Sequence, residues 1–322
     1  MSTVLISVVI PVKNGAATIQ KCLRALMAQT LADRLEIIVV DSGSTDGTQE
    51  LVKQFPVRLF QYPGAFNHGL TRNYGAGLAN GAFVHLTVAD SWHRDPANLE
   101  KMLAYFDDPA VAGVCGCQGT PTLPDSNPVQ WYNPMDKPTA ERLHFPDRNS
   151  FDHLPPGQMA AACAWDDVNA MYRKTFLDKY PFPETDFAED MAWAKIVLSE
   201  GATLVRDSGV VVYHYHYRTF NYSFKLDFTC HYHAYQLFRM RPSYPPLITN
   251  IAKAAYILIR NHSIKWPHKF RWLLHNISGE AGRWYAAYVF RKALRKKEGR
   301  GLTETYRYYC KTIPQGRLKA QI

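Results

Sequence analysis

The chain has 322 residues, of which 47% are hydrophobic and 20% charged, a globular composition that allows a sizeable core. No segment offers the ~18 consecutive apolar residues that a membrane-spanning helix requires, which argues against an integral membrane protein. The apolar N-terminal stretch lacks a basic region and a small-residue cleavage site, so we expect a core strand there rather than a signal peptide. We accordingly expect a cytoplasmic protein whose six cysteines are reduced.

The net charge of +9 is unevenly distributed along the chain. From residue 247 to the end, 16 Lys and Arg residues stand against 3 acidic residues, a charge of +13, whereas the remaining residues carry −4. In this tail the basic residues alternate with Trp, Tyr and Leu, which is typical either of helices packed on a catalytic core or of helices on an anionic membrane. We expect both together, and hence a peripheral protein at the inner face of the cell membrane. No nucleic-acid-binding motif is present, so we expect no nucleic acid partner.

The first ninety residues alternate between strand-like and helix-like segments. Four runs predict strands: 5–12, 35–41, 57–62 and 82–90. The runs 5–12, 35–41 and 82–90 are those expected to be buried, and the first is a continuous β-branched run typical of a strand covered on both faces. With helices between them, this order predicts an α/β fold with a mostly parallel central sheet flanked by helices. Ligands bind such sheets at the carboxyl ends of the strands, and Asp41 and Asp90 stand at two of these ends.

The rest of the chain is less regular. Residues 119–138 are rich in Pro, Asn and Asp and predict a long loop over the active face. After about residue 220 the pattern becomes helical and basic. We therefore expect a catalytic domain over 1–220, divided into a nucleotide-binding half (1–90) and an acceptor-binding half (91–220), and a helical, basic, aromatic-rich region over 221–322.

Residues 39–48 place a carboxylate beside the start of a predicted helix. Asp41 ends a strand, and Ser44 or Thr45 is the candidate N-cap of the helix that follows. A carboxylate at this position can accept the N3–H of uracil or thymine, and helix N-termini favour phosphate. A plain turn capped by Asp and Ser would give the same pattern, and the sequence favours neither interpretation.

Four polar side chains precede the strand that ends at Asp90: Asn67, His68, Arg72 and Asn73. An arginine near a helix start is well placed to contact both oxygens of a diphosphate. A polar surface helix would explain the charges, but it would not explain so many polar residues ahead of a buried strand.

Glu189 and Asp190 are adjacent acids at the start of another predicted helix. Their side chains point in different directions, so one can deprotonate a substrate hydroxyl while the other holds a sugar or a helix end. The plainer interpretation is that both only stabilise the helix dipole. Trp193 follows on the same face as Asp190 and is suited to stacking on a sugar ring. Asp166 and Asp167 form a competing pair that the sequence does not exclude.

Two histidine pairs differ in their predicted geometry. His214 and His216 fall on the same face at a strand end, which favours contact with a phosphate or a metal over two unrelated core histidines. His231 and His233 lie in a predicted helix, where they would point apart, and we expect them to be structural or to face the acceptor.

In this order, these motifs resemble the family-2 glycosyltransferases, which have a GT-A fold, and among them the bacterial rhamnosyltransferases that build surface polysaccharides. The resemblance runs from Ser7 to about Tyr217. It depends on the strand ending at Asp90 and on six further segments, "VVIPVKN", "IIVVDSGSTDGT", "FNHGLTRNYGA", "DVNAMYRK", "FAEDMAW" and "VVVYHYH".

The resemblance implies a nucleotide-sugar site in which the loop after the first strand and Asp41 hold the base and ribose, Asp46 supports that loop, and Arg72 faces the diphosphate. The residues implied in donor binding are Pro11, Lys13, Asn14, Asp41, Ser42, Asp46, Asn67, His68, Arg72 and Asn73. Asp90 and His214 would bind a divalent cation, Mg²⁺ or Mn²⁺, bridged to the diphosphate.

The resemblance also implies how the acids act. Asp190 resembles the catalytic base and Glu189 its acceptor-side partner, although the two roles could be exchanged. Trp193 and His216 would contact the acceptor. One displacement, in which the activated hydroxyl attacks opposite the departing nucleoside diphosphate, would invert the anomeric configuration.

The implied reaction is transfer of a sugar from a nucleotide-sugar donor, best guessed as dTDP-rhamnose, to a glycan or an undecaprenyl-linked glycan. The resemblance implies that this reaction serves the synthesis of O-antigen, capsule or exopolysaccharide. Other enzymes of glycan assembly would then be partners. A UDP-sugar donor stays open. A nucleotidyltransferase would need a Gly-rich N-terminal loop with a catalytic Arg and Lys, which "PVKNGAAT" does not supply. A non-catalytic binding module is the other alternative, favoured by Val88 and Ala89, since the family often has a first acid at the position of Val88.

Overall fold

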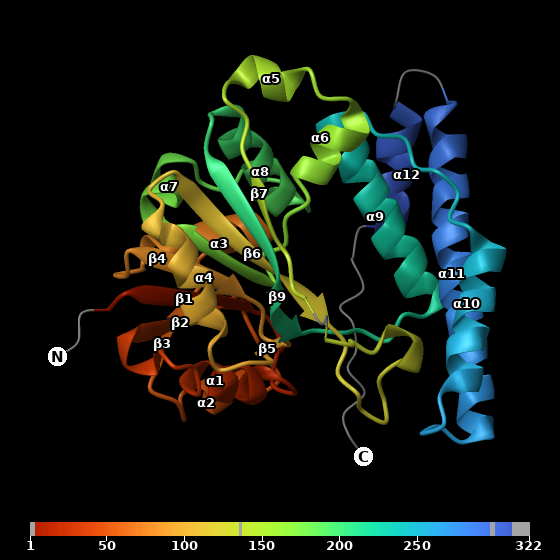
Figure 1. Cartoon of the computed structure of the whole chain (residues 1–322), viewed down its shortest axis with the longest axis horizontal. Helices are drawn as coiled ribbons and strands as arrows, with labels where there is room; N and C mark the ends of the chain where they lie inside the picture. Colours follow the sequence, from red (N-terminus) through yellow and green to blue (C-terminus); the bar gives the residue numbers. More distant parts are fainter. Residues whose placement is uncertain (1–3, 135–136, 297–299, 311–322) are drawn as a thin grey trace. The chain divides into compact units, whose positions relative to one another are not determined.

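The computed structural model describes residues 4–134, 137–296 and 300–310 (Figure 1). The chain forms two compact units. The first, here called the sheet unit, comprises the chain up to Gly119 together with residues 133–215. The second, the helical unit, comprises residues 120–132 and the chain from His216 onward. The segment 120–132, predicted as part of a loop over the active face, thus groups with the C-terminal helices.

The sheet unit is built on nine strands in the order β3-β2-β1-β4-β8-β6-β9-β5, with β7 paired to β9 (Figure 1). The strands are β1 Ile6–Val12, β2 Leu35–Asp41, β3 Arg58–Gln61, β4 Phe83–Thr87, β5 Trp92–His93, β6 Val111–Gly119, β7 Ala140–Leu143, β8 Asn169–Arg173 and β9 Thr203–Tyr213. The helices of this unit are α1 Ile19–Met27, α2 Thr48–Val52, α3 His68–Gly77, α4 Asn98–Leu103, α5 Arg148–Asp152, α6 Pro156–Ala162, α7 Lys174–Lys179 and α8 Glu189–Ser199.

The predicted α/β sheet is confirmed, and its parallel part comprises the first four strands. β1 pairs in parallel with β2 and β4, and β2 with β3. Beyond β4 the sheet is mixed, because β8 runs antiparallel to both β4 and β6, whereas β6 and β9 are parallel. All seven residues of β1 are buried, as a strand covered by helices on both faces requires.

The two faces of β1 are covered by different helices. On one face, Ile19 and Leu23 of α1 belong to the same apolar cluster as Ile10. On the other face α3 approaches so closely that a Cβ at Gly75 would lie 2.3 Å from the Val9 Cγ1 atom. A glycine is therefore required where α3 crosses the sheet.

Replacing Gly75 with Ala is expected to lower the free energy of unfolding by about 1–3 kcal/mol, because the added methyl group overlaps Val9. Chemical denaturation of the purified variant measures the change. The matched control is Gly77→Ala on the same helix, where the added Cβ meets no atom of another part of the chain within 4 Å. That variant should be neutral or slightly stabilising. Equal effects at the two positions would contradict the close approach of α3 to β1.

The helical unit contains α9 Phe220–Phe238, α10 Leu247–Arg260, α11 Trp266–Leu294 and α12 Arg300–Cys310. Its core joins Phe224 and Phe228 of α9 to Phe290 of α11 and Tyr306 of α12. His233 is buried beside the Tyr306 hydroxyl, 3.3 Å away, in keeping with the structural role left open for it. No helix in the described part of the chain is long and apolar enough to cross a bilayer. All six cysteines are free thiols.

Candidate functional site

The candidate site begins where β1 and β2 end side by side. In the parallel register, Val12 at the end of β1 lies opposite Asp41 at the end of β2. The carboxylate of this buried aspartate accepts hydrogen bonds from the amides of Gly43 and Ser44, both at 3.1 Å. It also accepts from the Ser44 hydroxyl and, at 2.7 Å, from the Gln49 side chain. Asp41 therefore caps its own turn in this structure, and its contact with a uracil or thymine stays a prediction.

The N-cap predicted at Ser44 or Thr45 is wrong, because the helix begins later. α2 starts at Thr48 and is preceded by Gly47, whose φ of 90° is left-handed. The residues between Asp41 and this glycine are held in the turn around the carboxylate, so they cannot start the helix. Glycine adopts the left-handed conformation without the strain that a side chain would add.

The loops after β1 and β2 are joined by hydrogen bonds. The side-chain oxygen of Asn14 accepts from the Thr45 amide at 2.9 Å, and Asp46 accepts from the Ala16 amide at 3.0 Å. Asp46 also accepts from the Thr48 hydroxyl. Although its slight burial works in the opposite direction, these hydrogen bonds lower the pKa of Asp46. An ionised Asp46 therefore braces the loop that contains Asn14.

The other predicted nucleotide contacts in this region differ in exposure. Pro11 is buried within β1, whereas Lys13 is exposed. Ser42 is buried, and its amide donates to the Val12 carbonyl at 2.9 Å. Its hydroxyl has no hydrogen-bond partner among the described residues. Because buried hydroxyls are nearly always paired, this one is available to a ligand at the end of β2.

Two predicted donor-binding residues of α3 instead hold the segment that precedes α8. Asn67 caps α3, accepting from the Leu70 amide at 3.0 Å, and its side-chain amide donates to the Thr185 carbonyl at 2.8 Å. Asn73 exchanges hydrogen bonds of 2.8 and 2.9 Å with the backbone of Phe182. The prediction that Asn67 and Asn73 contact the donor is corrected, because both side chains are occupied by the protein's own backbone.

Arg72 is a buried structural cation rather than a residue that faces the diphosphate. It is 4% exposed, its Nη1 donates to Glu189, and its Nε lies 3.4 Å from Asp167 Oδ2. With two carboxylates around it, its charge is already neutralised, so the prediction of a diphosphate contact is wrong for this structure. Burial, and then the positive charge of Arg72, lower the pKa of the half-buried His68, which is therefore neutral at pH 7.

The two acid pairs that the sequence left as competitors form one cluster. Asp167 and Glu189 share Arg72, and the Tyr172 hydroxyl donates to Asp167. Burial raises the pKa of Asp190 well above its ordinary range, and the three neighbouring carboxylates of Glu189, Asp167 and Asp166 raise it further. A carboxylate with a raised pKa is a stronger base, so Asp190 has the electrostatic environment of a general base.

Trp193 does not stack on an acceptor, as predicted, because its side chain is fully buried. The indole packs against Tyr172, at 4.7 Å between ring centroids, and against Phe182 at 6.1 Å. Its Nε1 donates to the Tyr180 carbonyl at 2.8 Å. This tryptophan instead fixes α8, and with it the acids at the start of that helix.

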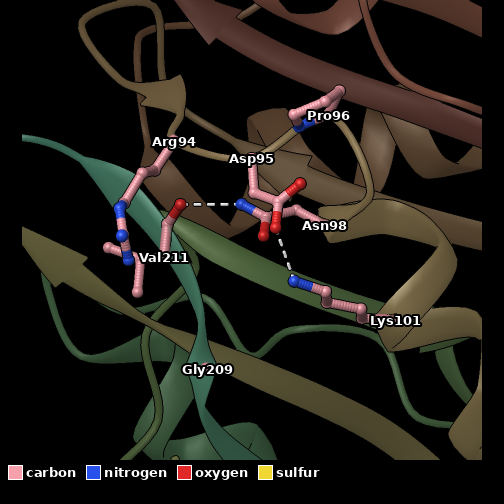
Figure 2. A pocket seen from close by; sticks show the side chains of 7 residues that line it. All are labelled: Arg94, Asp95, Pro96, Asn98, Lys101, Gly209 and Val211. Atoms are coloured by element: carbon pink, nitrogen blue, oxygen red, sulfur yellow. Dashed lines mark hydrogen bonds and ion pairs between the residues drawn. The ribbon is translucent and has the colours of Figure 1, made fainter. Parts of the chain in front are cut away.

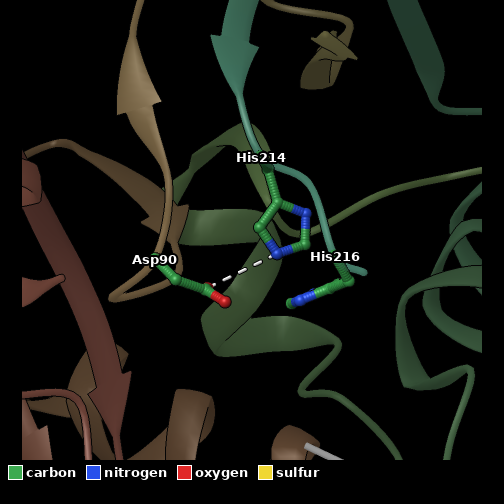
Figure 3. A group of neighbouring side chains, drawn as sticks. All are labelled: Asp90, His214 and His216. Carbon is green, nitrogen blue, oxygen red and sulfur yellow. Dashed lines mark ion pairs between the residues drawn. The ribbon is translucent and has the colours of Figure 1, made fainter. Parts of the chain in front are cut away.

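Asp90 and His214 are brought together by β5 and β9. Trp92 of β5 pairs with Tyr213 of β9, so the residues just outside the pair come close, and the Asp90 carboxylate lies 3.4 Å from His214 Nε2. Figure 3 shows both side chains with His216, two residues further along the same chain segment. The ligand atoms of the three residues all lie within 4.8 Å of one another. His216, predicted to contact the acceptor, is thus grouped with the predicted cation ligands.

Gln118 of β6 is a site residue that the sequence did not reveal. Its side-chain nitrogen donates to Asp166, and its oxygen lies 2.8 Å from His214 Nδ1. Because a carboxylate only accepts, the amide nitrogen must face Asp166 and the amide oxygen must face the histidine. The histidine therefore carries a proton on Nδ1, which leaves Nε2, 3.4 Å from the Asp90 carboxylate, as the nitrogen that could ligate a cation. The only sequence signal was a polar residue at the end of a strand of small and apolar residues.

One carboxylate and two imidazoles form a donor set that fits a divalent transition metal. Carboxylate oxygen suits Mg²⁺ and Mn²⁺ alike, whereas imidazole nitrogen is a poor ligand for Mg²⁺. The histidine tautomer set by Gln118 is the one that ligates a metal through Nε2. Asp90, His214 and His216 therefore form a candidate site for a divalent cation.

Replacing Gln118 with Leu is expected to weaken Mn²⁺ binding by about 10–100-fold, because His214 loses the partner that fixes its tautomer and orientation. Isothermal titration with Mn²⁺ in the presence of a nucleoside diphosphate measures the effect. Gln20→Leu is the control, since that side chain contacts only the amide of Gln54 among the hydrogen bonds described for it. Unchanged Mn²⁺ affinity in Gln118→Leu would contradict the assigned role.

A separate hollow of about 250 Å³ opens between the segment after β5, α4 and β9 (Figure 2). Figure 2 shows that its polar groups pair with one another: Lys101 lies 2.6 Å from Asp95, and Asn98 donates to the Val211 carbonyl at 2.7 Å. None of the predicted site residues lines it, so we do not assign the donor to this hollow.

Comparison with known proteins bears on the same part of the chain. The sequence model of the family described as Glycosyl transferase family 2 matches residues 7–160. The chain is 29% identical to the O-antigen chain rhamnosyltransferase WbaN of Salmonella anatum over 229 residues, 69% of this chain and 68% of that protein. It is also 29% identical to the O-antigen chain rhamnosyltransferase RfbN of Salmonella typhimurium over 221 residues, 66% of each.

Solved structures share the fold at low sequence identity. The mannosyltransferase PcManGT of Pyrobaculum calidifontis, solved with GDP-Man and Mn²⁺, matches with a TM-score of 0.56 at 19% identity, over 96% of this chain and 85% of that one. TarS 1-349 of S. aureus, solved with UDP-GlcNAc, matches with a TM-score of 0.54 at 16% identity, over 96% and 82%. The predicted GT-A fold with a C-terminal helical region is confirmed.

Proposed function

We propose, from the match of residues 7–160 to the glycosyl transferase family 2 model, that this chain is a family-2 enzyme and performs an inverting, metal-dependent transfer of one sugar from a nucleoside-diphosphate donor to a glycan acceptor. A single observation carries the proposal. The sheet unit connects a candidate cation ligand, His214, to an acid cluster through Gln118, and that cluster contains a carboxylate of raised pKa, Asp190. A cation site beside a general base is what glycosyl transfer from a diphosphate needs.

Each chain residue has a defined task in this reaction. Asp190 takes the proton of the acceptor hydroxyl, whose oxygen attacks the anomeric carbon from the face opposite the departing nucleoside diphosphate. Arg72 pairs with Glu189 and Asp167 rather than with Asp190, and burial and the neighbouring carboxylates keep the pKa of Asp190 raised although the charge of Arg72 lowers it. Asp90 and His214, with His216, would hold the divalent cation, which when bound offsets the charge on the leaving diphosphate.

For the donor we favour dTDP-rhamnose, because WbaN and RfbN are rhamnosyltransferases and their matches extend over two thirds of this chain. Both act on O-antigen chains, which supports a glycan or undecaprenyl-linked glycan of a bacterial surface polysaccharide as acceptor. UDP-glucose, UDP-galactose and UDP-N-acetylhexosamines are the second group of candidate donors, since uracil and thymine offer Asp41 the same edge.

The test is release of nucleoside diphosphate from a panel of donors, with and without an oligosaccharide acceptor, in Mn²⁺, Mg²⁺ or EDTA. We expect dTDP-rhamnose to be turned over fastest, with Mn²⁺ more effective than Mg²⁺ and EDTA abolishing the reaction. Preference for a UDP-sugar would overturn the donor assignment alone. If nucleotide sugars bind but no metal stimulates release of nucleoside diphosphate, the protein is a non-catalytic binding module and the proposed activity is wrong.

A further inference from the structure

Helix α10 of the helical unit is apolar on two opposite sides. Ala254 and Leu258 are buried against the rest of the unit. Ile248, Tyr256 and Ile259 form a second stripe at i, i+8 and i+11, and they are 84%, 60% and 56% exposed. A helix in contact with water on one side normally carries polar residues there, so this outer stripe indicates a partner.

The first turns of α11 repeat the pattern. Trp266, Phe270 and Leu274 follow one another at intervals of four residues and therefore line one side of the helix. Their exposed fractions are 68%, 64% and 52%. Large apolar side chains exposed to this extent, in two successive helices, go beyond the scattered apolar residues of an ordinary surface.

The end of α10 is tied to the start of α11, which lies beside it (Figure 1). The buried Lys269 amine donates to the Ile259 carbonyl at 2.9 Å and lies 4.8 Å from the centre of the Trp266 ring. This contact satisfies a carbonyl at the C-terminus of α10 and holds the exposed tryptophan in place. Lys269 therefore connects Ile259 of the first stripe to Trp266 of the second, and the two helices are here called the α10–α11 hairpin.

The charge around the two apolar stripes of the hairpin is of one sign. From residue 228 to residue 279 the chain has no Asp or Glu, whereas it has seven Lys and Arg residues. Four of the basic residues that flank the apolar stripes are exposed: Lys253, Arg260, Lys265 and Arg271. An apolar surface with this margin complements a partner that is negatively charged at its rim and apolar beneath.

We propose that the α10–α11 hairpin docks on an anionic lipid bilayer, with its aromatic and aliphatic side chains among the headgroups and upper acyl chains. Aromatic and aliphatic side chains interleaved with Lys and Arg are the composition of interfacial helices. A second copy of the chain fits less well, because it would bring two uniformly basic surfaces together. The inference does not depend on the glycosyltransferase activity, since binding is measured without donor or acceptor.

The experiment is flotation of the full-length protein with vesicles of phosphatidylcholine alone or with about one third phosphatidylglycerol. We expect binding to the anionic vesicles that weakens as salt is raised, because the basic margin is screened. The double variant Trp266→Glu with Phe270→Glu should bind at least about tenfold more weakly, since each change removes apolar surface from the membrane and adds a negative charge.

Tyr308→Glu is the matched control: this side chain, 77% exposed, belongs to α12 of the same unit. It should bind vesicles as the wild type does. Sedimentation analysis distinguishes the rival occupant: dimerisation that the double variant abolishes, without vesicle binding by the wild type, would overturn the proposal in favour of a second copy. Equal vesicle binding by wild type and double variant would also overturn it.

Discussion

Replacing Asp190 with Asn is expected to lower kcat by about 10²–10⁴-fold, the usual contribution of a general base, while donor affinity stays close to that of the wild type. Asparagine has nearly the same shape as aspartate but cannot take up the acceptor's proton. Turnover is measured by release of nucleoside diphosphate, and donor binding separately by isothermal titration. In the wild type, kcat/KM should fall as pH is lowered through the raised pKa of Asp190, well above the ordinary carboxyl range.

Asp186→Asn is the control for this variant, because Asp186 is an exposed acid four residues earlier and should leave turnover unchanged. Glu189→Gln tests whether the roles of the two adjacent acids are exchanged. If Glu189→Gln lowers kcat while Asp190→Asn leaves kcat unchanged, Glu189 is the base and the assignment to Asp190 is wrong.

Replacing Arg72 with Met is expected to lower the free energy of unfolding by about 3–5 kcal/mol, because two buried carboxylates, Asp167 and Glu189, lose their shared cation. Burial already raises the pKa of Asp167 to about 7, and the loss of Arg72, whose charge lowers this pKa, raises it further. The variant should therefore lose stability as pH rises toward the folded-state pKa of Asp167, and regain part of it in mild acid, where Asp167 is protonated. Urea denaturation between pH 5 and 8 measures both effects.

Two controls separate this buried cluster from an ordinary ion pair. Arg142→Met breaks an exposed pair with Asp108 and should cost no more than about 1 kcal/mol. Adding Asp167→Asn to Arg72→Met removes one uncompensated charge, so the double variant should be more stable than Arg72→Met alone. If Arg72→Met lowers the free energy of unfolding by no more than Arg142→Met does, Arg72 is not the cation that neutralises the acid cluster.

The sequence predicted those parts of the fold that depend on short-range patterns. Runs rich in β-branched residues identified the first strands, and Asp41 lies at the end of β2 as predicted. The strand predicted over 82–90 is shorter, because β4 ends at Thr87 and Asp90 lies in the turn three residues beyond it. His214 and His216, predicted to share one face at a strand end, lie just beyond β9, which ends at Tyr213, and their ligand nitrogens are close in space. The first strands were predictable because hydrophobic patterning along a strand is local information.

What the sequence could not predict depends on contacts between distant residues. Arg72 and Glu189 are 117 positions apart, and no local sequence pattern shows that the two side chains form a buried ion pair. Trp193 has helical spacing suited to a ligand contact, yet tertiary packing buries it. Gln118 reaches His214, 96 positions away, through the pairing of β6 with β9. The mixed half of the sheet was missed for the same reason.

The long-range contacts of α3 also determine when the site can form during synthesis. The Asn67 side chain donates to the backbone carbonyl of Thr185, 118 positions later, and Arg72 pairs with Glu189, 117 positions later. The parallel strands β1 to β4 are complete by Thr87, about a hundred residues before these partners have been made. A nascent chain stopped there would have an arginine that cannot be buried without an uncompensated charge. The contacts of α3 with the acid cluster can therefore form only after about a hundred further residues have been synthesised.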